Sequence, residues 1–211
     1  MSRYIGPSCR QCRREGVKLF LKGAKCLTDK CPVERRPYPA GQHGQSGGRS
    51  RKASEYSKQL REKQKVKRMY GLSEGQFRNL FEQVTSLPGV KGTNLLVALE
   101  TRLDNVVYRM GFASSRKDAR QFVRHGHIQV NGDKVNIPSF KVLPGMEVRV
   151  DPASKDLLRV KVAQELQSRG AQVSWLSVDA DKAAGRLTER PTREAIPINA
   201  QEQLIVELYS K

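Results

Sequence analysis

The chain of 211 residues is strongly basic, with 39 Lys and Arg against 21 Asp and Glu and a formal net charge of +18 at pH 7. Such an excess attracts polyanions, either nucleic acid or an anionic membrane surface, and repels basic partners. Hydrophobic residues make up 37% of the chain, which allows one or two domains with a modest core.

The chain shows no targeting or membrane signal. Its start, MSRYIGPSCR, lacks the apolar stretch of a signal peptide, and no run of about 18 apolar residues follows. We therefore expect a cytoplasmic protein with no membrane partner. The charge is also uneven, because residues 1–70 hold 19 of the basic but only 5 of the acidic residues. This concentration predicts a polyanion-binding N-terminal part rather than a generally solvated surface.

All four cysteines lie near the N-terminus, in the pairs Cys9/Cys12 and Cys26/Cys31. Two residues between the first pair and a loop of about a dozen residues between the pairs let four sulfurs surround one ion. Nearby Lys and Arg side chains favour the thiolate form that coordination requires. The spacing therefore predicts one structural zinc ion, Zn2+, with all four positions filled by sulfur.

Three other interpretations of the cysteines stay open. Two disulfides conflict with a reducing cytosol. Four unrelated thiols are the second alternative. An iron–sulfur cluster also uses four cysteines, and the sequence separates it poorly from zinc.

A segment rich in proline, glycine and basic residues follows the cysteines, and we call residues 32–52 the strap. Its prolines and glycines exclude a continuous helix or inner strand. Tyr38 and His43 add stacking faces among the cations, which favours a segment laid along phosphates and ordered only on its partner. The alternative is a disordered basic linker.

Helical patterns follow the strap. One helix is predicted from Ser54 to Gly71, with a cationic face of Lys58, Arg61, Lys65 and Arg68. A second opens with the capping box Ser73/Gln76. A third, capped at Thr93, has an apolar stripe that runs to Met110.

The second half of the chain predicts a mixture of helices and strands. A helix opens at Ser115 with Asp118 as its capping-box partner, and Asn131-Gly132 fits a two-residue hairpin turn. The further expected elements are a strand within 140–150, a helix over 155–168, a strand over 173–179, an irregular stretch over 181–198, and a final helix with Asn199 and Glu202 as its capping box.

The stretch TRLDNVVYRMGFASSRKDARQFVRHGHIQVNGDKVNIPS resembles the small RNA-binding module of the bacterial S-four ribosomal protein family. The stretches MSRYIGP, ERRPYPAGQHG, LREKQKVKRMYG and LIVELYSK are similar to other parts of that family's proteins. The resemblance covers nearly the whole chain. Because many members lack the cysteines, this chain is similar to the zinc-bearing members.

The resemblance implies an α+β fold with an N-terminal metal-binding knot and a mainly helical domain, into which an α/β domain is inserted. The inserted domain would carry the module of two helices and a hairpin. The implied boundaries are 1–45 for the knot and the first part of the strap, 46–95 plus 197–211 for the helical domain, and 96–196 for the inserted domain, with the module at about 100–150.

The resemblance also implies a function. Members bind 16S ribosomal RNA directly at a junction of several helices, nucleate small-subunit assembly and contribute to translational accuracy near the channel through which mRNA enters. They contact ribosomal protein S-five and other small-subunit proteins, and some repress their own messenger.

The expected RNA contacts of this chain are basic, aromatic and amide side chains. They are Arg3, Tyr4, Arg13, Arg14, Arg35, Arg36, Tyr38, Gln42, His43, Arg49, Arg51, Lys52, Lys58, Arg61, Lys65, Arg68, Arg116, Lys117, Arg120, Arg124, His125 and Asn131. Among them, Arg49, Arg51 and Lys52 fall near the family's messenger-channel arginines.

An enzyme is the main functional alternative. The same module accompanies pseudouridine synthases, which use an aspartate within Arg-Leu-Asp, and this chain has Arg102-Leu103-Asp104. We expect this tripeptide inside the module's first helix, and no further stretch of sequence is left for a catalytic domain. A zinc-bearing transcription factor is another alternative. The favoured interpretation is a ribosomal protein that is not an enzyme and has no small-molecule substrate.

Overall fold

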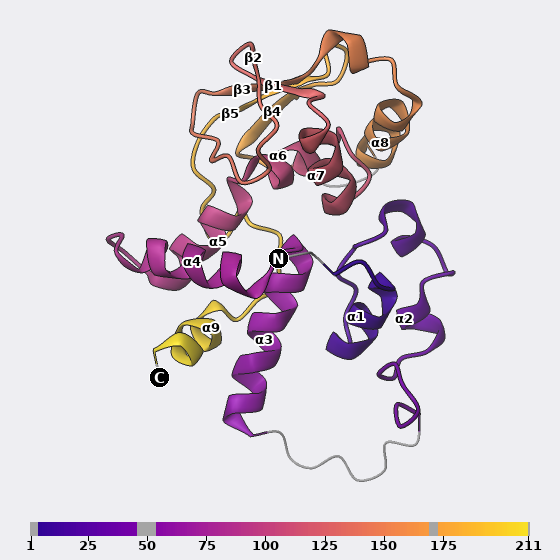
Figure 1. The fold of residues 1–211 in the computed structure, drawn as a ribbon, viewed down its shortest axis with the longest axis vertical. Coiled ribbons are helices and arrows are strands. Elements are labelled where there is room, and N and C mark those ends of the chain that lie inside the picture. The colour runs from indigo at the N-terminus through magenta and orange to yellow at the C-terminus, as the bar shows by residue number, and fades with distance from the viewer. Residues whose placement is uncertain (1–3, 46–53, 169–172, 211) are drawn as a thin grey trace. The chain divides into compact units, whose positions relative to one another are not determined.

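The computed structural model describes residues 4–45, 54–168 and 173–210. The chain divides into two compact units (Figure 1), of which the first combines residues 1–92 with 199–211 and the second comprises 93–198. The regular elements described in the first unit are all helical, whereas the second holds a five-stranded antiparallel sheet. The α+β class is therefore confirmed. Among the described helices, none is both long and apolar enough to cross a bilayer.

Unit 1 is built from short helices around the long helix α3. Its elements are α1 (Ser8–Glu15), the 3-10 turn η1 (Gly23–Cys26), α2 (Pro32–Arg35), α3 (Glu55–Tyr70), α4 (Glu74–Thr85) and α9 (Glu202–Tyr209), and α5 (Lys91–Glu100) leads into unit 2. The predicted capping box is confirmed, because Ser73 and Gln76 form both of its hydrogen bonds. The helix predicted to start near Ser54 has Ser54 as its N-cap, whose hydroxyl accepts a hydrogen bond from the N–H of Ser57.

The C-terminal helix α9 packs back onto unit 1. The Tyr209 ring stacks on Phe81 with 4.6 Å between centroids, and the amide of Gln59 in α3 donates to Glu207 at 3.0 Å. The predicted capping box of Asn199 and Glu202 is wrong, because the N-cap is Gln201 and its side chain makes no capping bond. The Gln201 N–H instead donates to a carboxylate oxygen of Glu62 in α3 at 2.7 Å. A tertiary partner thus replaces the local cap.

Unit 2 places two short helices and a longer one on an antiparallel sheet. The elements are α6 (Leu103–Arg109), α7 (Arg116–Arg124), β1 (Ile128–Val130), β2 (Asp133–Lys134), β3 (Glu147–Val150), η2 (Pro152–Ser154), α8 (Leu158–Ser168), β4 (Leu176–Asp179) and β5 (Ala184–Leu187). The strand order is β2-β1-β3-β5-β4. The strand predicted over 173–179 is observed over its last four residues as β4, and the final helix predicted after Asn199 begins at Glu202.

One face of the sheet forms the core of unit 2 against α6 and α7 (Figure 1). Ile128 in β1 and Val148 in β3 are fully buried. The next residue of each strand, Gln129 and Arg149, points to the other face, and the two side chains hydrogen-bond to each other at 2.8 Å. This alternation follows the two-residue period of a strand. At Gly185 the sheet comes so close to α6 that an added Cβ would lie 3.0 Å from the sulfur of Met110.

The predicted hairpin turn is confirmed. Val130 pairs with Asp133, and the two residues between them, Asn131 and Gly132, have φ angles of 51° and 96°. Two successive positive φ angles are what a tight turn with the natural strand twist requires. The Asn131 side chain also accepts a hydrogen bond from the N–H of Glu147 at 2.9 Å, so it is already used inside the fold.

The single helix predicted from Thr93 to Met110 is wrong, because the chain breaks between α5 and α6. Arg102 is extended, with φ −68° and ψ 139°. The N–H of Leu103 donates to the carbonyl of Phe140 at 2.8 Å, and the carbonyl of Thr101 accepts from the N–H of Val142 at 2.9 Å. Pairing with a distant segment therefore replaces helical hydrogen bonds over these residues. Arg-Leu-Asp consequently lies at the start of α6 and not inside a helix.

The stretch 181–198 was predicted to be irregular, and this is wrong for β5. Its four residues, AGRL, are too short and too small for a clear strand pattern, yet they pair with both β3 and β4. Position between two strands decides the conformation here, since both edges of β5 find hydrogen-bond partners.

Glu74 is expected to stabilise unit 1 in a pH-dependent way. Burial by itself would raise the pKa of Glu74, but hydrogen bonds and charge from Lys63 and Lys67 outweigh it and lower the pKa from 4.5 to about 2. The contribution is therefore present above pH 4.5 and is lost as the pH falls through about 2. Because the side chain is 46% exposed, we expect Glu74→Gln to cost about 1 kcal/mol at pH 7 and progressively less towards pH 2.

Denaturant unfolding of the wild type and the variant between pH 7 and pH 2.5 measures this difference. Glu82→Gln is the control, because its ion pair with Arg78 is 60% or more exposed on both sides and contributes at most about 0.5 kcal/mol. A difference for Glu74→Gln that does not change with pH would contradict the lowered pKa.

Candidate nucleic-acid interface

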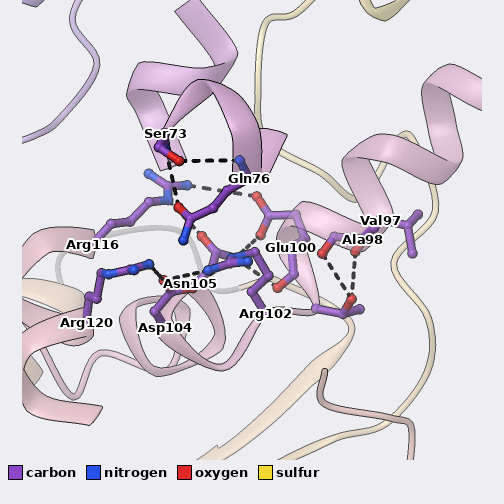
Figure 2. Close-up of polar contacts among 11 residues, drawn as sticks. Ser73, Gln76, Val97, Ala98, Glu100, Arg102, Asp104, Asn105, Arg116 and Arg120 are labelled. Carbon is purple, nitrogen blue, oxygen red and sulfur yellow. Dashed lines mark hydrogen bonds and ion pairs between the residues drawn. The ribbon is translucent and has the colours of Figure 1, made fainter. Parts of the chain in front are cut away.

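The start of α6 holds a buried carboxylate that joins two arginines (Figure 2). Arg102 donates from Nε and Nη2 to the two oxygens of Asp104, both at 3.2 Å, and Arg120 of α7 donates from Nη1 at 3.1 Å. The Asp104 side chain is 7% exposed and that of Arg120 is 13% exposed. Charge-assisted bonds of this kind, shielded from water, hold α7 against the first turn of α6.

A second buried carboxylate, Glu100 at the end of α5, organises the next set of side chains. Its side chain is fully buried and accepts hydrogen bonds from Asn105 at 2.6 Å and from Arg109 at 2.9 and 2.7 Å. Arg116 donates from Nε to the Asn105 amide oxygen at 2.7 Å, and its guanidinium lies 4.7 Å from the ring centre of Tyr108. Arg116 is thus held by Asn105 and by the Tyr108 ring, and Figure 2 shows it beside Asn105 and Glu100.

These contacts divide the basic residues of α7 that were predicted to share one RNA-binding face. Arg116 and Arg120 are 10% and 13% exposed and pair with buried carboxylates. Lys117 is half-buried, whereas Arg124 and His125 at the end of the helix are exposed. The positions that remain open to a polyanion therefore lie towards the C-terminal end of α7.

His127 is half-buried and packs against the core of unit 2. Its ring stacks on Phe122 with 4.8 Å between centroids, and its Nδ1 lies 2.7 Å from the hydroxyl of Ser154. Burial, together with the nearby charges of Arg159 and His125, lowers the pKa of His127 and favours the neutral ring.

The predicted cationic face of α3 is largely occupied by ion pairs. Lys58 bonds to Glu55 and Lys65 to Glu62, each at 2.7 Å. Arg61 and Arg68 both reach Glu15 of α1, whose side chain is only 2% exposed. Burial raises the pKa of Glu15, and the charges of the two arginines oppose that rise. Glu15 thereby joins the cysteine-bearing helix to α3.

The first part of the strap is tied to α1 by an arginine. Arg13 donates to the carbonyls of Tyr38 at 2.8 Å and Pro39 at 3.2 Å, and its guanidinium lies 4.6 Å from the Tyr38 ring centre. Arg35 donates to the carbonyl of Asp29 at 3.2 Å. The remaining predicted contacts in the described part of this region are exposed. They are Tyr4, Arg14, Arg36, Gln42 and His43. Arg3, Arg49, Arg51 and Lys52 lie outside the described residues.

The four cysteines are free thiols, and three of them are buried. Cys12 packs with Leu19 and Leu21 in a small core, and the N–H of Lys22 points to the sulfur of Cys26 at 3.4 Å. Burial raises the pKa of the Cys12 and Cys26 thiols, and each is raised further by the charge of neighbouring cysteines. The charges of the cysteines thus act on one another, and Cys26 has a backbone donor suited to a thiolate.

The described cysteine side chains are not arranged as a metal-binding site. Over the parts of the chain that the structure describes, no three His, Cys, Asp or Glu side chains are gathered closely enough to hold a metal ion. The donor chemistry and the backbone donor at Cys26 fit a thiolate-bound metal. The positions of the sulfur atoms in the structure do not by themselves define a metal site.

Sequence reasoning missed the buried carboxylates that organise this surface. Glu15 and Glu100 were not singled out, and Asp104 was considered only as a synthase-like aspartate. A usable signal was present, because Glu100 and Asp104 interrupt the apolar stripe that contains Leu96, Leu99 and Leu103. A charged residue on a buried helix face needs a partner of opposite charge.

Comparisons with known proteins agree with this architecture. Residues 101–148, which hold α6, α7 and the hairpin, match the family described as the S4 domain, and residues 3–100 match the family described as Ribosomal protein S4/S9 N-terminal domain. These matches define a ribosomal protein that carries an S4 domain.

The relatives that match over the full length give the family itself. The chain is 54% identical to small ribosomal subunit protein uS4 of Thermus thermophilus, 56% to uS4A of Myxococcus xanthus and 55% to uS4 of Caldicellulosiruptor bescii, in each case over 100% of both chains. The chain belongs to the small ribosomal subunit protein uS4 family. The resemblance of the sequence motifs is confirmed at this level.

Phe122 and Arg124 should separate stability from RNA contact in α7. Phe122 is fully buried, so Phe122→Ala should leave a cavity that costs about 3 kcal/mol or more, with RNA binding lost only as unit 2 unfolds. Arg124 is exposed, so Arg124→Gln should change stability by less than about 0.5 kcal/mol.

The single tryptophan of the chain, Trp175, is fully buried in unit 2, so its fluorescence reports the unfolding of that unit. Denaturant curves followed by this signal measure both variants. Equal stability of Phe122→Ala and the wild type would show that this core position does not hold unit 2 together.

Proposed function

We propose that the protein is a structural component of the small ribosomal subunit that binds 16S ribosomal RNA directly. The observation that carries this function is the full-length identity of 54–56% to small ribosomal subunit proteins uS4 and uS4A. The S4 domain over residues 101–148 and the net charge of +18 supply the binding module and the attraction to phosphates. The family makes it a structural protein and not an enzyme.

We propose that the RNA target is a junction of several helices. Double-stranded RNA hides its base edges in a deep, narrow major groove, so a protein recognises its shape, phosphates and 2′-hydroxyls. Exposed cations held on rigid elements suit such recognition. In unit 2 they include Arg124, and in unit 1 they include Arg14 and Arg36.

Several finer roles belong to the same proposal. They are early action in subunit assembly, contact with ribosomal protein S-five and other small-subunit proteins, and a contribution to accuracy near the channel through which mRNA enters. Arg49, Arg51 and Lys52 would serve the messenger channel. The remaining predicted RNA contacts, including Arg3 and Asn131, stay predictions, and the ion pairs of Arg116 and Arg120 with buried carboxylates leave these two arginines less accessible than the sequence indicated.

We also propose that the chain is a zinc-bearing member of the family. Cys9, Cys12, Cys26 and Cys31 would hold one Zn2+ as thiolates. Bound zinc would act as a structural cross-link between α1 and the loop that follows it. The buried sulfurs of Cys12 and Cys26, the short local core around Leu19 and the N–H of Lys22 support this role, since so small a core needs an additional link.

The RNA-binding proposal predicts a preference for shape. The protein should bind a multi-helix junction fragment of 16S ribosomal RNA much more tightly than a simple duplex of equal length. Binding should weaken steeply with salt, because each phosphate contact releases condensed counterions. Titrations of both RNAs at several salt concentrations measure the preference. Equal affinities at moderate salt would leave only general charge attraction and contradict the proposed function.

The zinc proposal predicts one metal ion per chain in protein purified under reducing conditions, with metal–sulfur distances of about 2.3 Å. A chelator should disorder residues 1–31 and leave the fluorescence of Trp175 in unit 2 unchanged, because that residue belongs to a separate core. Metal analysis and X-ray absorption measure the site. Strong visible absorption would indicate an iron–sulfur cluster instead, and protein without metal would contradict the site.

A further inference from the structure

We infer that Asp104 and Arg120 form a positioning pair for RNA recognition, in which Arg120 acts through Asp104 and does not contact a phosphate. The inference rests on the proposed RNA-binding function and assigns these residues a role within it. It changes the status of Arg120, which the sequence places among the phosphate contacts, and of Asp104, which the sequence compares with a catalytic aspartate.

The first support is the burial and geometry of the pair. Arg120 donates to Asp104 at 3.1 Å while Arg102 binds both oxygens of the same carboxylate at 3.2 Å. The three side chains are 7% to 13% exposed. Each oxygen of the carboxylate thus has a partner (Figure 2).

The second support is the free-energy cost of binding a phosphate through Arg120. A phosphate that took the guanidinium away from Asp104 would disturb a buried carboxylate whose charge depends on its partners. Removing one member of a buried ion pair is strongly unfavourable, because the remaining charge is left without compensation. Exposed cations such as Arg124 carry no such penalty. A polyanion should therefore bind at Arg124 and leave the Arg120 pair intact.

The third support is the place of the pair in the fold. Asp104 lies in the first turn of α6 and Arg120 in the middle of α7, so their bond connects the two helices of the S4 domain. Arg124 lies one helical turn beyond Arg120. The angle that the pair sets between the helices is therefore passed on to the exposed end of α7. Recognition of an RNA junction by shape depends on such a fixed arrangement of contacts.

The pair makes a prediction that a phosphate contact does not. Arg120→Gln should leave the slope of binding against salt unchanged, because no counterion release is lost. It should lower the preference for junction over duplex by about tenfold, the scale at which residues that act through others change binding. Arg124→Gln should flatten the slope by about 0.7 to 0.9, the value for one phosphate contact.

Asp104→Asn tests the other member of the pair. It should lower the preference for the junction RNA to a similar degree, although it makes the protein more positive. Asp156→Asn is the matched control, because it changes the net charge equally in the same unit from a side chain that is 90% exposed. The control should raise the affinity for both RNAs alike and leave their ratio unchanged.

The experiment titrates a multi-helix junction fragment of 16S ribosomal RNA and a duplex of equal length at several salt concentrations. Trp175 fluorescence confirms that unit 2 is folded in each variant. A slope that Arg120→Gln flattens as much as Arg124→Gln does would overturn the inference. A junction preference that survives in folded Asp104→Asn, as in Asp156→Asn, would also overturn it.

If Asp104→Asn does not fold, a further variant tests the positioning role of Arg120. Arg120→Lys keeps the positive charge but loses the planar fork of donors. It should lose junction preference at an unchanged salt slope, and a retained preference would contradict the positioning role. The wild type separates the two proposals. If the wild type itself shows no preference for the junction, the proposed function fails, whereas a preference that none of these variants changes removes only the positioning pair.

Discussion

The ion pair of Asp104 with Arg102 and Arg120 is the interaction on which the S4 domain of this protein depends. This ion pair forms because the helical conformation is interrupted at Arg102 and a new helix begins at Leu103. The interruption turns the Asp104 carboxylate towards α7. Glu100, at the end of the preceding helix α5, pairs in a similar way with Arg109 and Arg116. Two buried acids thus set the arrangement of α6 and α7.

The same principle holds unit 1 together. Glu15 connects the cysteine-bearing helix α1 to α3 through Arg61 and Arg68, and Glu74 connects α3 to the C-terminal helix through Lys63 and Tyr209. In a chain with a net charge of +18, self-repulsion opposes compactness. A few acids at contact points between elements relieve it locally. They also determine which cations stay available for a polyanion.

Local signals predicted much of the fold. The helix start near Ser54, the capping box at Ser73 and the Asn131-Gly132 turn depend on residues within a few positions of one another, and all three are observed. The wrong predictions share a different cause. The break at Arg102 and the strand β5 arise from hydrogen bonds to segments far away in the chain, which propensity and periodicity within one window do not contain.

For the candidate site, composition and motifs were enough to indicate the family, the α+β class and the attraction to RNA, because net charge and long motifs do not depend on how the chain packs. Whether a given arginine faces solvent or a carboxylate was decided only in the folded chain. Arg68 meets Glu15 from 53 residues away, and Arg120 meets Asp104 from 16. A helical wheel places Arg120 and Arg124 on one face, but burial against α6 gives the first an internal partner and leaves the second exposed.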